Sequence, residues 1–452
     1  MKSEQPIVVI AALMLLLASA EARPSDPEDG VSTTEARLRE LEAKLSRIEQ
    51  DEDAPSWFVG YDKGFVFRST DMEKNPFALK INGRMQFRYT NFQNDEDDYV
   101  NRGTFFGGPP FAATDIDERS DFEIERGRLE FAGTFWDPRM HFYINIDADT
   151  DDNHRAIFHD FWMNYEFNEA FDLHFGKAFV PGSREWLDGS TRTHLADRSM
   201  ATTFFRPDRS VGVWAIGQPS EGFHYRAMIG NGFNTTDLSP GQMNDEPIVS
   251  GSVWFEPCGD FGKGYADIQA ENETRTRFGA SLTWGREDGT ASNGVALAES
   301  NFLRLDDGTR LTSLGVTRYD LTLLAVDAAL KSGGFGLHGE LYYRWLNRIK
   351  PTGPFPAFPE RTNRSWGFYT TAGYMVVPEE IEVVVSTSTV QGRFKDSWEY
   401  AFGGNYFVDG THKNKLTLDF TLLDGSPAQN SGPGFVAGYD GWLIRLQYQI
   451  AF

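Results

Sequence analysis

The C-terminal segment from Trp442 to Phe452 alternates between apolar and polar side chains, and this alternation constrains the fold more than any other feature of the chain. The apolar positions are Trp442, Ile444, Leu446, Tyr448, Ile450 and Phe452, and the positions between them include Leu443, Arg445, Gln447 and Gln449. Successive side chains of a β-strand point to opposite faces, so the segment predicts a strand with one apolar face. Such a strand fits a soluble β-sandwich or a membrane barrel, and alternation up to the last residue favours the barrel.

A second segment, residues 77–90, has the same two faces. Its apolar face carries Phe77, Leu79, Ile81, Gly83, Met85, Phe87 and Tyr89, and its other face carries Ala78, Lys80, Asn82, Arg84, Gln86, Arg88 and Thr90. In a barrel the apolar face meets lipid, so the polar face lines water. The terminal Phe452 also resembles the last residue of bacterial outer-membrane barrels, whose aromatic side chain is read by the barrel assembly machinery.

The composition agrees with strands that are half lipid-facing and half water-facing. Aromatic residues make up 14% of the chain, with 37 Phe, while the mean hydropathy is only -0.44. After residue 20 no run of eighteen apolar residues occurs, so the sequence predicts no transmembrane helix. A membrane protein without helical spans must be a closed barrel, because hydrocarbon satisfies no backbone hydrogen bonds.

The alternating segments predict an all-β transmembrane antiparallel barrel of about sixteen strands. The expected strands are 77–92, 121–136, 140–150, 157–168, 171–180, 209–218, 222–232, 247–256, 276–286, 318–330, 334–348, 364–375, 379–391, 397–408, 413–424 and 440–452. Short connections, expected at the periplasmic end, alternate with long polar loops, expected at the extracellular end. Residues 257–275 break this rule, because they are too long for a periplasmic turn.

Three regions are expected along the chain. Residues 1–20 read as a cleaved secretory signal peptide, with an apolar run that is too short to span a membrane; an uncleaved anchor is the alternative. Residues 21–56 read as a linker and a short N-terminal coiled-coil helix, in which Leu38, Leu41, Leu45 and Ile48 form the seam. The helix either joins three protomers or packs on its own barrel. Residues 57–452 form the barrel, with a constriction loop at about 181–208.

Several function classes are excluded or disfavoured. The 43 basic residues against 66 acidic ones give a net charge of -23, which argues against nucleic acid as a partner. The chain has no G-x-x-x-x-G-K-[ST], no G-x-S-x-G and no H-E-x-x-H sequence, so we expect no enzyme activity, catalytic residue, cofactor or metal. The single Cys258 leaves no internal disulfide framework.

The inward faces of two neighbouring strands are expected to form a basic stripe along the lumen wall. Its members are Lys80, Arg84, Arg88, Arg126 and Arg128. A ladder of weak cationic sites lets an anion step through a channel without a deep trap. Alternatively, these side chains pair with Glu130, Asp147 or Asp160 across the wall, as in many general porins.

A second basic set surrounds the long loop after the fifth strand, which is where porins fold a segment into the barrel. Its members are Lys177, Arg184, Arg192, Arg198, Arg206 and Arg209, partly offset by Glu185, Asp188, Asp197 and Asp208. Arginine keeps its charge and grips phosphate or carboxylate, so arginines at a constriction favour anions. An ordinary surface loop with mixed charges is the alternative.

Three stretches resemble the phosphate-selective porin O/P family: INGRMQFRYTNF at 81–92, IERGRLEFAGTFWDPRMHFYINIDAD at 124–149, and the strand-loop-strand of 171–217. The resemblance implies a trimeric sixteen-stranded barrel whose third loop folds inward and whose basic side chains lead anions to it. The sequence departs from the family at Phe179, near a common Lys, and at Ala196-Asp197-Arg198, where the family has M-E-R.

Together these observations predict an outer-membrane porin of a Gram-negative-type envelope that passes small solutes, anions such as phosphate among them. The expected partners are outer-membrane lipid, small anions, two further copies of the chain, and the barrel assembly machinery through Phe452. An envelope-anchoring or adhesive barrel is the alternative function.

Overall fold

The computed structural model describes residues 56–95, 118–150, 156–233, 246–288, 303–311, 314, 316–351, 361–428, 437 and 440–452, together with Arg37 and Arg39. Arg37 and Arg39 are helical. The expected signal peptide, the linker and the remainder of the expected coiled coil lie outside the described residues.

The chain divides into two units, of which the smaller comprises residues 1–80 and 133–138. It contains a hairpin of β1 (Trp57–Tyr61) and β2 (Phe65–Ser69), paired in register from Trp57 with Ser69 to Tyr61 with Phe65. The Trp57 and Phe67 rings stack with centroids 4.8 Å apart. Gly64 takes a φ of 143° in the turn, a conformation that glycine adopts readily. The alternation argument did not anticipate this hairpin, because apolar residues occupy both of its faces.

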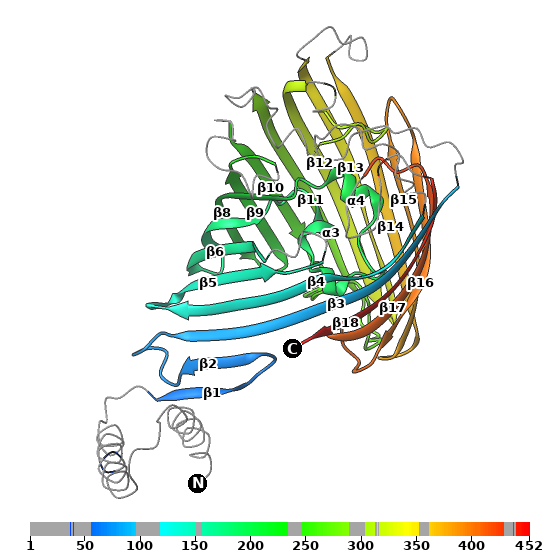
Figure 1. Cartoon of the computed structure of the whole chain (residues 1–452). Helices are drawn as coiled ribbons and strands as arrows, with labels where there is room; N and C mark the ends of the chain where they lie inside the picture. Colours follow the sequence, from blue (N-terminus) through cyan, green and yellow to red (C-terminus); the bar gives the residue numbers. More distant parts are fainter. Residues whose placement is uncertain are drawn as a thin grey trace, which may run out of the picture. The chain divides into compact units, whose positions relative to one another are not determined.

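The larger unit, residues 81–132 and 139–452, holds the barrel (Figure 1). Sixteen strands, β3 to β18, follow one another around it in chain order, and β18 pairs antiparallel with β3, which closes the sheet. Both the closed barrel and its sixteen strands confirm the prediction. The strands are β3 (Ala78–Asn94), β4 (Glu118–Phe135), β5 (Asp137–Asp147), β6 (Ile157–Asn168), β7 (Phe171–Phe179), β8 (Arg209–Ser220), β9 (Phe223–Gly230), β10 (Ile248–Phe255), β11 (Arg275–Asp288), β12 (Val316–Ser332), β13 (Phe335–Pro351), β14 (Asn363–Val377), β15 (Ile381–Gln391), β16 (Ser397–Phe407), β17 (Asn414–Asp424) and β18 (Gly441–Ala451).

The alternation of side chains produces two faces of opposite character. Large apolar side chains stand exposed on the outer face, as at Val213, Ile229, Val385 and Leu418. Because β18 pairs with β3, each described barrel strand has a neighbour on both sides, and the backbone groups of these strands are satisfied inside the sheet. In an outer membrane this apolar face meets lipid.

The connections at one end of the barrel are short, with one exception. Two residues join β12 to β13, and both are glycines in the left-handed region, Gly333 with φ 59° and Gly334 with φ 83°. The exception is the connection between β10 and β11, residues 256–274, which we name the inserted turn. Its side chains Phe261, Tyr265 and Ile268 are buried.

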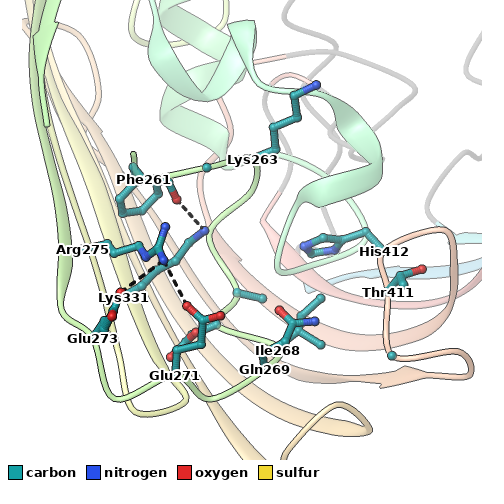
Figure 2. A pocket seen from close by; sticks show the side chains of 14 residues that line it. Phe261, Lys263, Ile268, Gln269, Glu271, Glu273, Arg275, Lys331, Thr411 and His412 are labelled. Carbon is teal, nitrogen blue, oxygen red and sulfur yellow. Dashed lines mark hydrogen bonds and ion pairs between the residues drawn. The ribbon is translucent and has the colours of Figure 1, made fainter. Parts of the chain in front are cut away.

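The inserted turn enters the barrel, which accounts for its length. The Tyr265 ring stacks on His338 of the β13 inner face, with centroids 3.6 Å apart. Figure 2 shows Lys331 of β12 reaching the turn, where its Nζ donates to the Phe261 carbonyl at 3.2 Å. A cavity of about 330 Å³ lies between the turn, Lys331 and His412 of the β16–β17 connection.

Candidate functional site

The connection between β7 and β8 folds into the barrel; we name residues 181–208 the inward loop. It contains α3 (Arg184–Leu187), a 3-10 turn η3 (Ser190–Arg192) and α4 (Met200–Phe205), and Figure 1 shows α3 and α4 within the ring of strands. Serine side chains begin both helices: Ser183 Oγ accepts from Trp186 N, and Ser199 Oγ accepts from Thr202 N. All six residues of α4 are buried.

Carboxylates of the far wall hold the inward loop by its backbone. A buried backbone N–H needs an acceptor, and carboxyl oxygens supply it here. Three such bonds join the loop to strands β13, β17 and β16: Arg184 N to Glu340 at 2.9 Å, Ala196 N to Asp419 at 2.8 Å, and Met200 N to Glu399 at 2.7 Å.

The loop also bonds to the two strands that close the barrel. From β3, Gln86 donates to the Ser190 carbonyl at 3.2 Å, and Arg88 donates to the Ala196 carbonyl at 3.2 Å. From β18, Gln447 donates to the same Ala196 carbonyl at 3.3 Å, and Gln449 donates to the Thr191 carbonyl at 3.0 Å. The inward loop therefore spans the junction of the first and last barrel strands.

A buried ionic cluster fixes the middle of the loop. Asp197 lies 2.7 Å from Arg126 and 3.3 Å from Arg88, and Glu125 lies 3.2 Å from Arg126 and 3.3 Å from Arg88. All four side chains are buried. Burial acts to raise the pKa of Asp197, but Arg126, Arg88 and Arg198 outweigh it and hold that pKa far below its ordinary value. Asp197 is thus an anion that binds the loop to β3 and β4.

Most cations of the predicted basic stripe have an acidic partner. This agrees with the alternative that these side chains pair with carboxylates across the wall. Arg88 and Arg126 face inward as expected, but they belong to the buried cluster. Their neighbours pair across the wall: Arg84 with Glu130 at 3.5 Å, Arg128 with Asp147 at 2.7 Å, and Arg209 with Asp160 at 2.9 Å. By its position in β3, Lys80 shares the inward face with Arg84 and Arg88.

Four other cations of the loop region lie in three different surroundings. Arg198 and Arg206 are buried, with their guanidinium carbons 4.5 Å and 4.4 Å from the Trp186 ring, so they pack the loop internally. Arg192 lies against the inserted turn, where a β-carbon at Gly264 would come within 3.1 Å of Arg192 Cβ. Lys177 lies on the outer face of β7, opposite His174, and its Nζ donates to the Phe158 carbonyl at 2.6 Å. The structure therefore does not bring Lys177 to the constriction.

The inner faces of the barrel strands differ in their exposure from one part of the wall to another. On the inner faces of β13 to β18, side chains such as Tyr342, Glu382, Lys415 and Arg445 are buried beneath the inward loop and the inserted turn. On β5 to β10, several inner-face side chains keep partial exposure: Tyr143, Trp162, His224, Arg226 and Trp254. Because lipid does not reach the inner face, this exposure is to water within the barrel.

Arg226 of β9 faces this water and was missed by the sequence analysis. Among the described residues no carboxylate lies within 4.0 Å of it; its Nη2 donates to the Phe179 carbonyl at 3.1 Å. Among the same described residues, the acidic partner of Arg184 is Asp327 at 3.8 Å, which Arg277 shares at 3.9 Å. The alternation of His224, Arg226 and Met228 with the apolar Phe223 could have identified Arg226 as inward-facing.

Within the described part of the chain, no helix has the length and apolarity that crossing a membrane requires. The same residues contain no group of three or more His, Cys, Asp or Glu side chains placed to hold a metal ion.

Comparisons with known proteins address the fold and the family. The anion-selective porin from Comamonas acidovorans is similar at 13% identity, with 83% of this chain and 100% of that chain covered and a TM-score of 0.51. OmpT of Vibrio cholerae is similar at 10% identity, with 83% and 98% covered and a TM-score of 0.50. No curated protein matches the chain. The family model described as phosphate-selective porin O and P matches residues 99–450. The chain belongs to the phosphate-selective porin O and P family.

Proposed function

We propose that this porin forms a water-filled channel in the outer membrane and passes small solutes with a preference for anions. The observation that carries the anion preference is Arg226, a guanidinium without a carboxylate partner among the described residues, on the inner wall that borders water. An unneutralised cation beside a narrow aqueous path lowers the free energy of an anion there and raises that of a cation. The overall net charge of -23 does not decide this preference, because exposed charges are screened within about 8–10 Å.

The predicted pathway residues then take two roles. Arg84, Arg128, Arg184 and Arg192, with Lys80 and Arg226, line the path that an anion follows. Arg88, Arg126, Arg198, Arg206 and Arg209 hold the inward loop in place, and so set the width of the path rather than contact the ion. A solute moves by diffusion, so the protein needs no catalytic group.

The assembly is proposed to be a homotrimer, which a structure of OmpT of Vibrio cholerae in a trimer form supports; it is similar at a TM-score of 0.51 and 10% identity. Residues 1–20 direct export and are removed. Phe452 is read by the barrel assembly machinery, and the outer apolar face meets outer-membrane lipid.

The reversal potential across a planar bilayer under a KCl gradient tests the anion preference. Arg226→Gln should shift this potential toward the cation side relative to the unaltered protein. Lys177→Gln is the matched control, because it removes one positive charge from the outer face, and it should leave the potential unchanged. An unaltered protein with no chloride preference, or an Arg226→Gln variant with the original potential, would contradict the proposal.

A further inference from the structure

Aromatic side chains line the inner faces of strands β5 to β10, the wall that borders water. We name this set the aromatic band: Tyr143, Trp162, His174, Trp214, His224 and Trp254. The rings contact one another in two groups. In the first, Tyr143 lies 5.4 Å from Trp162, Trp162 lies 4.9 Å from His174, and His174 lies 5.2 Å from Trp214. In the second, His224 lies 5.1 Å from Trp254.

Four rings of the band, those of Tyr143, Trp162, His224 and Trp254, are partly exposed. Pore walls that pass only hydrated inorganic ions have no need of such rings, because a hydrated ion gains nothing from apolar contact. Partly exposed aromatic surface beside a few placed polar groups is instead the composition of a site for an organic solute.

Two cations with little acidic pairing among the described residues lie on this band. The Arg184 guanidinium carbon lies 4.2 Å from the centre of the Trp254 ring, and that of Arg226 lies 5.7 Å from the centre of the Trp214 ring. A guanidinium can bind a carboxylate through two parallel N–H donors while its flat face stays on the ring. The two guanidiniums and the two tryptophan rings therefore place positive charge next to flat apolar surface. Arg226 and the rings belong to the strands, and Arg184 belongs to the inward loop.

Acidic groups near the band limit what can bind. Glu256 lies 3.9 Å from His224, and Asp172 accepts from His174 at 2.9 Å and from Asn164 at 2.7 Å. Asp327 partly offsets Arg184. These carboxylates reduce the net positive charge, so charge alone holds an anion weakly, and the rings must supply the remaining affinity.

We propose that the aromatic band, with Arg184 and Arg226, is a binding site for small aromatic carboxylates inside the channel. The proposal rests on the anion preference proposed above and adds the substrate class. The carboxylate pairs with a guanidinium, and the ring of the solute packs against the partly exposed surface of Trp254 beside Arg184.

Block of the chloride current in planar bilayers tests this site, with benzoate as the probe and cyclohexanecarboxylate as the matched acid without an aromatic ring. An aromatic ring packed on another gains a factor of about 3 to 10 in affinity beyond its buried area. Benzoate should therefore half-block the current at a concentration about 3- to 10-fold lower than cyclohexanecarboxylate does. In Trp254→Leu the two half-blocking concentrations should become equal. Trp366→Leu, which removes a tryptophan from the outer face, should keep the original ratio.

A second variant separates the ring from the charge. Arg184→Gln should raise both half-blocking concentrations together and keep their ratio. If both concentrations stay unchanged in this variant, the proposal is overturned, whether or not Trp254→Leu folds. Equal block by the two acids in the unaltered protein, or an unchanged ratio in folded Trp254→Leu, would overturn the proposal. If the unaltered channel prefers chloride yet shows equal block, the aromatic site alone fails; if it shows no chloride preference, the proposed function fails first.

Discussion

Asp197→Asn removes the central anion of the buried cluster and leaves every backbone bond of the barrel in place. Of the two carboxylates between Arg126 and Arg88, Glu125 would then remain, and both guanidiniums are almost fully buried. Breaking a buried ion pair by removing one partner costs about 3–5 kcal/mol, because the remaining charge stays out of water. The sheet does not depend on Asp197, so this cost falls on the docking of the inward loop.

A loss of about 3–5 kcal/mol lowers the docking equilibrium of the loop by about 10²- to 10⁴-fold. We expect a larger single-channel conductance with more current noise in Asp197→Asn, while the barrel still migrates as a folded species before heating in detergent. Glu273→Gln is the control: its 3.4 Å pair with Arg275 is exposed and worth about 0–1 kcal/mol, so conductance should hardly change. Equal conductance and noise in Asp197→Asn and the unaltered protein would refute the anchoring role of the cluster.

Three further predictions concern the loop, the C-terminus and export. Burial raises the pKa of Glu185 in the inward loop to about 7 from 4.5, so the stability that its proton gives the docked loop is full below pH 4.5 and is lost as the pH rises through 7. Conductance measured between about pH 5 and pH 9 should rise above pH 7, and this rise should be absent in Glu185→Gln. Deletion of Phe452, whose backbone N donates to the Gly83 carbonyl at 2.9 Å, should lower the folded fraction in cells, measured by heat-modifiable migration on gels; an unchanged fraction would count against its role in assembly. N-terminal sequencing of the purified protein should begin near Glu21, and an intact Met1 would contradict the signal peptide.

The strands could be predicted from the sequence because their rule is local. A strand with one face in lipid must alternate, and the alternation of segments such as 77–90 and 442–452 is visible without knowledge of any partner strand. The same rule places Arg84, Arg88 and Arg126 on the inner face, where the structure has them.

The burial of the inner-face side chains and their ion-pair partners could not be predicted in this way. Alternation gives the face of Arg88 but not whether a distant segment covers it, and the loop residue that covers it, Asp197, is more than one hundred positions away. Lys177 shows the opposite failure: its phase with Phe175 indicates the outer face, yet its place beside the long loop put it in the predicted constriction set. The inserted turn was visible only as a connection of the wrong length, since its burial depends on His338 and Lys331 of other strands.

The bonds from β3 and β18 to the inward loop have a consequence for the order of assembly. Gln86 and Arg88 come from the first barrel strand, and Gln447 and Gln449 come from the last, so the seat of the loop is incomplete until the two ends of the sheet meet. The pairing of β3 with β18 and the docking of the inward loop are then one cooperative event. In the finished barrel, separation of β3 from β18 would also break the contacts that both strands make with the inward loop. The loop therefore resists lateral opening at the pairing that joins the first and last strands of the barrel.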